Sequence, residues 1–257
     1  MLASVDGAIG RAEEATIPVT DEGLLRGDGA FEVMRLYSGR PFALDEHLTR
    51  LQRTCAGIRL ELDLAALERD VAALLAQAGP IEGLLRIVLT RGGRRIAIVE
   101  PLPRQSPVAR VATIRYAPNR VTDYLKTLSY AANVLARRLA VEQGYDEALL
   151  VTPHGRVLEG PTWSFFWVRG GRLLTPPLED RILGSITRAR ILAVTDAVEE
   201  PTTTDDLRGA DEAFIASTIR EVLPIAAIDD LQLPAAPGPV TLAAREALQR
   251  AIAAEVS

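Results

Sequence analysis

The chain has few of the residues that hold metals, disulfides or nucleic acids. Its 257 residues include one cysteine, Cys55, and two histidines, so there is no internal disulfide and no Cys/His cluster for zinc. No apolar run approaches the roughly 18 to 20 residues of a membrane helix, and the N-terminus has no signal-peptide pattern. A formal charge of −5 without a dense basic stretch argues against nucleic acid. We therefore expect a cytoplasmic protein with no metal, membrane or nucleic-acid partner.

Lysine is the scarcest basic residue. Of the 29 basic side chains only Lys126 is lysine, and the rest are arginine. Arginine replaces lysine on a surface, but its guanidinium stays protonated and cannot act as a neutral amine. A single remaining lysine is a candidate for chemistry that needs an amine, such as a Schiff base or proton transfer. The alternative is an incidental surface lysine, and the count alone does not decide between the two.

What is present fits a folded, mixed protein. Hydrophobic residues make up 48% and charged residues 25%, and the length suffices for one large domain or two modest ones. Helical spacing of apolar residues predicts helices over 44–59, 63–78, 125–143, 186–197 and 239–255. Strand-like runs lie at 31–37, 84–91, 110–117, 147–153, 156–160, 165–175 and 212–218. This order predicts an α+β fold.

A polar stretch divides the chain. Pro118–Asp123 is the best candidate linker, which predicts an N-terminal domain over 1–117 and a C-terminal domain over 124–257. Asp63 is a candidate N-cap for the second helix, and Cys55 falls on the apolar face of the first. We expect Cys55 to be packed core volume.

Six ordered motifs carry a resemblance that covers most of the chain. They are DEGLLRGDGAFE (21–32), DEHLTRL (45–51), LKTLSYAANV (125–134), VLEGP (157–161), GSITR (184–188) and ADEAFIASTIREVLP (210–224). Together they resemble the class IV, or fold-type IV, pyridoxal-phosphate enzymes, which include D-amino-acid and branched-chain aminotransferases, (R)-selective amine aminotransferases and aminodeoxychorismate lyases. The resemblance implies a two-domain fold with a smaller N-terminal α/β domain and a larger, barrel-like C-terminal domain. It also implies a homodimer whose cofactor lies between the domains and near the partner subunit.

The resemblance assigns roles to specific residues. Lys126 matches the lysine that forms the internal aldimine and then moves the proton between substrate and cofactor, in agreement with the lysine count. Glu159 matches the carboxylate that keeps the pyridine nitrogen protonated. Tyr130 matches a tyrosine that bonds the cofactor's phenolic oxygen, and a helix over 125–143 would place it on the same face as Lys126.

The phosphate of pyridoxal phosphate needs hydrogen-bond donors. Arg50 matches the family's phosphate arginine, whose bidentate geometry suits an oxyanion. Ile186 and Thr187 match a helix N-terminus that supplies amides and a hydroxyl, and Thr218 matches a further phosphate contact. One departure lies nearby, since Ser164 stands where relatives often carry an asparagine.

Two reactions fit the resemblance. The first half resembles D-amino-acid aminotransferases, which pass an amino group from a D-amino acid or (R)-amine to a 2-oxo acid through a pyridoxamine form. The second half resembles aminodeoxychorismate lyases, which release 4-aminobenzoate and pyruvate in folate synthesis. We favour the aminotransferase.

Either reaction requires recognition of substrate carboxylates, for which arginine is suited. The candidates lie in the first half of the chain: Arg26, Arg35, Arg86, Arg91, Arg94 and Arg95. The R-x-H pair of well-known D-amino-acid aminotransferases is absent, because Ile96 and no histidine follows Arg95. A structural ion pair is at least as good an interpretation of each arginine.

Overall fold

The computed structural model describes residues 1–256 and divides the chain into two units. Unit 1 contains Met1–Arg104, Leu125–Tyr130 and, at the other end of the chain, Glu255 and Val256. Unit 2 contains Gln105–Tyr124 and Ala131–Ala254. The chain thus leaves unit 1, returns to it for six residues, leaves it again and returns once more at Glu255.

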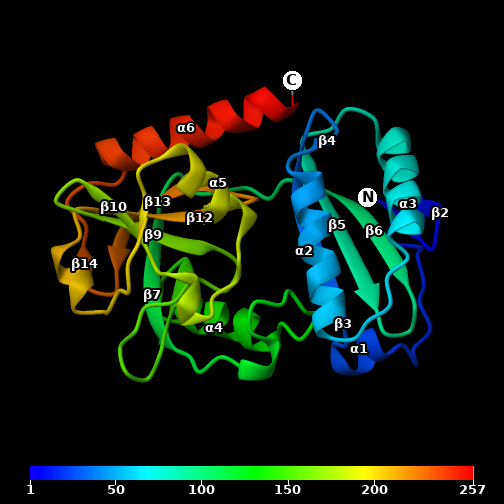
Figure 1. The fold of residues 1–257 in the computed structure, drawn as a ribbon, viewed down its shortest axis with the longest axis horizontal. Coiled ribbons are helices and arrows are strands. Elements are labelled where there is room, and N and C mark those ends of the chain that lie inside the picture. Colours follow the sequence, from blue (N-terminus) through cyan, green and yellow to red (C-terminus); the bar gives the residue numbers. More distant parts are fainter. Residues whose placement is uncertain (257) are drawn as a thin grey trace. The chain divides into compact units, whose positions relative to one another are not determined.

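Unit 1 is an antiparallel sheet of six strands in the order β2-β1-β6-β5-β3-β4. The strands are β1 (Leu2–Val5), β2 (Ala8–Arg11), β3 (Gly29–Tyr37), β4 (Arg40–Pro41), β5 (Gly83–Thr90) and β6 (Arg95–Pro101). The helices are α1 (Glu22–Arg26), α2 (Leu44–Gly57) and α3 (Leu64–Ala78). Helices α2 and α3 pack on strands β3, β6 and β1 of this sheet (Figure 1).

Alternation along β3 decides which side chains enter the core of unit 1. Met34 and Leu36 point toward the helices and pack in one cluster with Leu51 of α2 and Leu67 of α3. Cys55 belongs to the same cluster, and burial raises the pKa of its thiol to about 11. The expectation that Cys55 is core volume is confirmed.

Unit 2 is built on a second, curled sheet with the strand order β11-β10-β9-β12-β13-β7-β8, and β14 pairs with β13 (Figure 1). The strands are β7 (Ala109–Arg115), β8 (Glu147–Val151), β9 (Ser164–Arg169), β10 (Arg172–Thr175), β11 (Val198–Glu199), β12 (Glu212–Ser217), β13 (Glu221–Ile228) and β14 (Leu231–Gln232). The helices are α4 (Ala131–Glu142), α5 (Ile186–Val194) and α6 (Pro239–Val256), with short 3-10 turns at Arg120–Thr122, Leu178–Asp180 and Asp206–Gly209. The curled sheet gives this unit the predicted barrel-like character.

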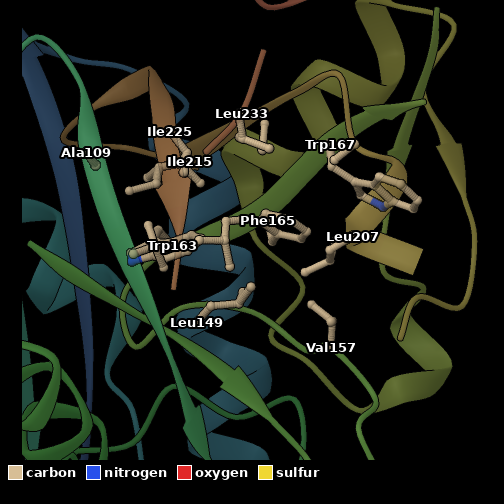
Figure 2. Packing of buried hydrophobic residues seen from close by; sticks show 14 of the residues in the cluster. Ala109, Leu149, Val157, Trp163, Phe165, Trp167, Leu207, Ile215, Ile225 and Leu233 are labelled. Carbon is tan, nitrogen blue, oxygen red and sulfur yellow. The ribbon is translucent and has the colours of Figure 1, made fainter. Parts of the chain in front are cut away.

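The core of unit 2 is aromatic. Figure 2 shows Trp163, Phe165 and Trp167, which alternate along β9 and its entry, packed with Ile215 of β12 and Ile225 of β13. All five side chains are buried. No helix within residues 1–256 has the length and apolar content needed to cross a membrane.

The division into units differs from the predicted one at two places. Strand β7, expected in the N-terminal domain, lies in unit 2, because it pairs in parallel with β8 and with β13. Leu125–Tyr130, expected in the C-terminal domain, lies in unit 1. The stretch predicted as a linker, Pro118–Asp123, is part of unit 2 and contains a 3-10 turn.

Two predicted elements are wrong in extent. The helix expected over 125–143 begins only at Ala131, because the backbone before it bonds to β3 instead. The strand expected over 156–160 is reduced to isolated bridges, Val151 with Val157 and Arg156 with Thr203.

Candidate active site

The single lysine of the chain lies on an extended segment beside β3. Phe31 N donates to Lys126 O at 3.1 Å, and Ala30 forms an isolated bridge with Thr127. On the other side, Lys126 N donates to Thr54 Oγ1 of α2 at 3.2 Å. The backbone of Lys126 is therefore fixed by both β3 and α2.

Two aromatic rings lie beside the lysine amine. Lys126 Nζ is 4.3 Å from the centroid of the Phe31 ring and 5.7 Å from that of Tyr130. The two rings meet edge to face, with centroids 5.2 Å apart. Tyr130 thus lies near Lys126 as predicted, but through an extended segment and not through a shared helix face.

Helix α2 presents a polar face made of His47, Arg50 and Thr54, which are three and four residues apart and so lie on one side. Arg50 Nε donates to Glu32 Oε1 at 2.7 Å, and Arg50 Nη2 donates to Glu32 Oε2 at 2.6 Å. His47 Nδ1 lies 2.7 Å from Glu32 Oε2. Glu32 therefore binds two side chains of α2 from strand β3.

The charges in this cluster follow from its contacts. Burial raises the pKa of Glu32, but the hydrogen bonds from Arg50 and His47 outweigh burial and lower it to about 2. Burial lowers the pKa of His47, and the positive charges of Arg50 and Lys126 oppose its protonation further. We therefore assign an ionised Glu32 and a neutral His47 whose Nδ1 carries the hydrogen. Within residues 1–256, His47 Nε2 is buried without a hydrogen-bond partner.

In unit 2, Glu159 is held at a defined place. Its Oε1 accepts a hydrogen bond from Leu183 N at 2.9 Å, and its backbone oxygen accepts from Leu150 N of β8 at 2.9 Å. The pKa of Tyr116 is raised by burial and by the negative charge of Glu159. The carboxylate is half-buried and close enough to the Tyr116 ring to affect its ionisation.

Helix α5 begins three residues after Leu183. Ser185 is its N-cap, and the Ser185 hydroxyl accepts from Arg188 N at 3.2 Å. The amides of Ile186 and Thr187 lie in the first turn, where a helix has no acceptor for them, and such amides favour anions. Helix α5 packs against β12, and Thr218 lies half-buried in the turn that follows this strand.

Comparison with known proteins identifies the family of the chain. The family model described as amino-transferase class IV matches residues 29–228. The chain belongs to the class IV aminotransferases.

Several aminotransferases are similar to this class IV aminotransferase over most of its chain. A putative branched-chain-amino-acid aminotransferase of Methanocaldococcus jannaschii is 33% identical, with 84% of each chain covered. D-alanine aminotransferase of Bacillus licheniformis is 30% identical over 98% of this chain and 97% of its own. The solved fold IV-transaminase of Curtobacterium pusillum is 27% identical, covers 94% of this chain and 92% of its own, and has a TM-score of 0.84.

Membership decides the cofactor and the fold. Class IV aminotransferases use pyridoxal 5'-phosphate, so it is the cofactor of this chain as well. The fold is that of fold-type IV transaminases, as the motifs predicted. The family membership predicted from the motifs is confirmed.

Most of the candidate substrate arginines of this class IV aminotransferase form ion pairs. Arg91 donates to Asp28, Arg94 to Asp6 and Arg95 to Asp70, so this run of arginines is distributed over three acids. The sequence predicts these three arginines as one loop cluster, but Arg95 begins strand β6. The exposed Arg26 pairs with Glu22 at 2.6 Å.

Two other candidates lie on the face of the sheet that carries Phe31. Arg35 follows Phe31 by four residues on β3, and its guanidinium lies 4.7 Å from the centroid of the Tyr37 ring. Arg86 of β5 pairs with Val33 in register and binds Glu100 through Nε and Nη2. Both therefore share a sheet face with the ring that contacts Lys126.

Sequence reasoning did not select Glu32 or Thr54. Glu32 follows the motif glycines, and its alternation with Met34 and Leu36 places a carboxylate in the buried register of β3. A charge at such a position is a detectable signal, because unpaired buried charges are costly. Thr54 carries no signal of its own, since its bond to Lys126 spans 72 residues.

Proposed function

We propose that this chain transfers an amino group from a D-amino acid or an (R)-amine to a 2-oxo acid. The observation that carries the chemistry is the single lysine, fixed by β3 and α2 with its amine against two aromatic rings. The donor preference is supported by the D-alanine aminotransferase of Bacillus licheniformis, which matches along almost the whole chain. The Methanocaldococcus jannaschii relative favours branched-chain amino acids as the competing donors.

The donor set of the chain fits pyridoxal phosphate. Its aldehyde needs an amine, its pyridine nitrogen an anion, and its phosphate several N–H and O–H donors. We assign these to Lys126, to Glu159, and to Arg50 with Ile186, Thr187 and Thr218. Tyr130 is assigned to the phenolic oxygen, because its ring lies beside the same amine.

Lys126 Nζ is the group that moves the proton. The bound cofactor supplies a ring that accepts the electron pair released when the substrate loses its Cα proton. Lys126 Nζ takes that proton from the substrate and then delivers it to the cofactor. The contacts of its backbone with Phe31 and Thr54 keep the amine in one place during both steps.

Glu159 has an electrostatic role. Its carboxylate keeps a proton on the pyridine nitrogen, which strengthens the ring as an electron acceptor. The hydrogen bond from Leu183 N orients one carboxylate oxygen and stabilises the ionised form.

For the substrate carboxylate we favour Arg86 and Arg35 over the other arginines. Both lie on the sheet face of Phe31, whose ring contacts the lysine amine. Arg26, Arg91, Arg94 and Arg95 already have acidic partners away from this face. Arg86 has to exchange its bond with Glu100 for one with the substrate, so its role is testable by Arg86→Gln, which should raise KM for the donor more than it lowers kcat.

The donor is tested by the half-reaction. D-alanine is added to the cofactor-loaded protein without any oxo acid, and the loss of the yellow absorption is followed together with pyruvate release. Bleaching by D-alanine and not by L-leucine supports the proposal. Bleaching by L-leucine alone assigns the branched-chain donor, and release of 4-aminobenzoate from aminodeoxychorismate alone assigns the lyase.

The role of Lys126 is tested by Lys126→Arg, which keeps the positive charge and removes the neutral amine. We expect turnover to fall by at least about a hundredfold, because proton transfer by a placed base contributes that much or more. Borohydride should fix the cofactor on the peptide that contains Lys126 in the wild type. Turnover by the variant, or a label elsewhere, would show the assignment to be wrong.

A further inference from the structure

Glu32 is an acidic side chain with no access to solvent, placed on the helix-facing side of β3. Its exposed fraction is 0%, and its neighbours on that face, Met34 and Leu36, are apolar core residues. A carboxylate at such a place stabilises nothing unless it is fully bonded. Its bonds go to Arg50 and His47 of α2.

The contact between Glu32 and Arg50 fixes the orientation of the Arg50 guanidinium as well as its distance. Nε and Nη2 of Arg50 each meet a different oxygen of Glu32, at 2.7 and 2.6 Å, so the two planar groups are held edge to edge. Because the guanidinium is planar, this contact sets the orientation of all five of its N–H groups. An anion bound by Arg50 then meets donors that are already oriented.

We infer that Glu32 is the positioning residue of the phosphate site: it orients the Arg50 guanidinium and does not itself touch the cofactor. This inference rests on the proposed role of Arg50 as a phosphate donor. His47 supports Glu32 from the second side, since its Nδ1 bonds the same Oε2 that Arg50 Nη2 uses. The three side chains act as one unit, in which Glu32 is the shared acceptor.

Charge and orientation predict opposite effects for the loss of Glu32. The carboxylate offsets the positive charge of Arg50, so its removal by charge alone would strengthen phosphate binding. Its removal also frees the guanidinium to rotate, which would weaken phosphate binding. The inference requires that orientation dominates.

The test compares pyridoxal phosphate with pyridoxal, which lacks the phosphate. Equilibrium affinities of both are measured on the full-length protein freed of cofactor, for the wild type, Glu32→Gln, Glu32→Asp and Arg50→Gln. Hydrogen bonds to a charged group correspond to about ten- to a hundredfold in affinity. We expect Glu32→Gln to lose that factor for pyridoxal phosphate and to keep the wild-type affinity for pyridoxal.

Two variants control the experiment. Asp70→Asn breaks a comparable helix-to-strand pair in unit 1, between α3 and Arg95 of β6, and should leave both affinities unchanged. Glu32→Asp keeps the charge but shortens the side chain, and it should lose phosphate affinity partly. The loss of pyridoxal binding as well would show that Glu32→Gln is unfolded. In that case the ratio of the affinities of Glu32→Asp for pyridoxal phosphate and for pyridoxal decides.

The outcomes separate the inference from the proposed function. If Arg50→Gln loses phosphate selectivity and the Glu32 variants do not, or bind more tightly, the positioning role is wrong and the phosphate role of Arg50 stands. If Arg50→Gln keeps wild-type selectivity, both are wrong. A parallel loss in the Arg50 and Glu32 variants, absent in Asp70→Asn, supports both.

Discussion

A buried carboxylate couples the stability of unit 1 to pH. Glu32 has a pKa of about 2 in the folded chain against 4.5 for an ordinary glutamate, because Arg50 and His47 bond its ionised form. A depressed pKa stabilises the folded state above the unfolded value, and this contribution disappears as the pH falls through the folded value. The stabilising contribution of Glu32 is therefore lost as the pH falls from about 4.5 to about 2.

This predicts how Glu32→Gln compares with the wild type in denaturant. The variant should be less stable than the wild type at pH 6, and the difference in the free energy of unfolding should shrink as the pH falls through that window. Urea unfolding at a series of pH values measures it. A difference that stays constant down to pH 2.5 would contradict the assigned ionisation of Glu32.

A second prediction concerns Glu159 and the tyrosine near it. Glu159→Gln should retain the cofactor but slow the half-reaction by about a hundredfold or more, because the pyridine nitrogen loses its anionic partner. It should also lower the pKa of Tyr116 toward the value that burial alone produces, since the negative charge that opposes tyrosinate is gone. Stopped-flow absorbance follows the first effect, and ultraviolet titration of the tyrosines follows the second.

Glu179→Gln is the matched control for this experiment. Glu179 lies in the 3-10 turn Leu178–Asp180 of the same unit, and its charge is not among those that raise the pKa of Tyr116. An equal change of the Tyr116 titration in the two variants would contradict the assigned contact.

At the scale of the element, helix ends followed local sequence signals closely. Asp63 accepts from Ala66 N at 2.9 Å, as an N-cap does, and α3 begins at Leu64. The predicted helix over 63–78 is confirmed to within one residue. Hydrogen bonds at a helix terminus form between neighbouring residues, so they can be predicted from the local sequence.

The cap predicts a measurable loss of stability. Asp63→Ala should lower the free energy of unfolding by about 1 kcal/mol, since the first turn of α3 loses an acceptor. Glu61→Ala, on an exposed residue two positions earlier, serves as the control and should change it by less than about 0.5 kcal/mol. Thermal or urea unfolding measures both, and equal losses would show that the cap contributes nothing specific.

The helix expected over 125–143 shows the limit of local patterns. Its apolar spacing is helical, yet the first six residues are extended, because Phe31 N and Leu128 N bond across to other segments. Such bonds join residues about a hundred positions apart. The spacing of apolar residues within the segment therefore cannot predict these bonds.

Strand β13 shows a similar effect. It was not among the predicted strands, and it contains Pro224, which cannot donate a backbone hydrogen bond to a sheet. In the structure Pro224 pairs with Phe214 of β12, and the pairing of β13 with β7 begins only after it, at Ile225. The proline is tolerated because one side of the strand is still unpaired there.

At the scale of the whole molecule, the resemblance predicts a homodimer. Size-exclusion chromatography with light scattering should give twice the chain mass of 27.8 kDa. A mass of one chain would contradict this prediction. The measurement should be made with and without pyridoxal phosphate, because a ligand bound at a subunit contact shifts the equilibrium toward the assembled form.

The sequence by itself determined the family and the cofactor, because both follow from the motifs. It also supplied the candidate residues for the chemistry, among them the one lysine of 29 basic residues. It also predicted helices α2 to α6 and strands β3, β5, β7, β8, β9, β10 and β12, whose apolar patterns are local. It did not predict α1 or the remaining strands. Only the tertiary structure decided that Leu125–Tyr130 joins unit 1 and that β7 joins unit 2. It alone showed Thr54 on the backbone of Lys126 and Glu32 on Arg50, since these contacts form between segments that are brought together by packing.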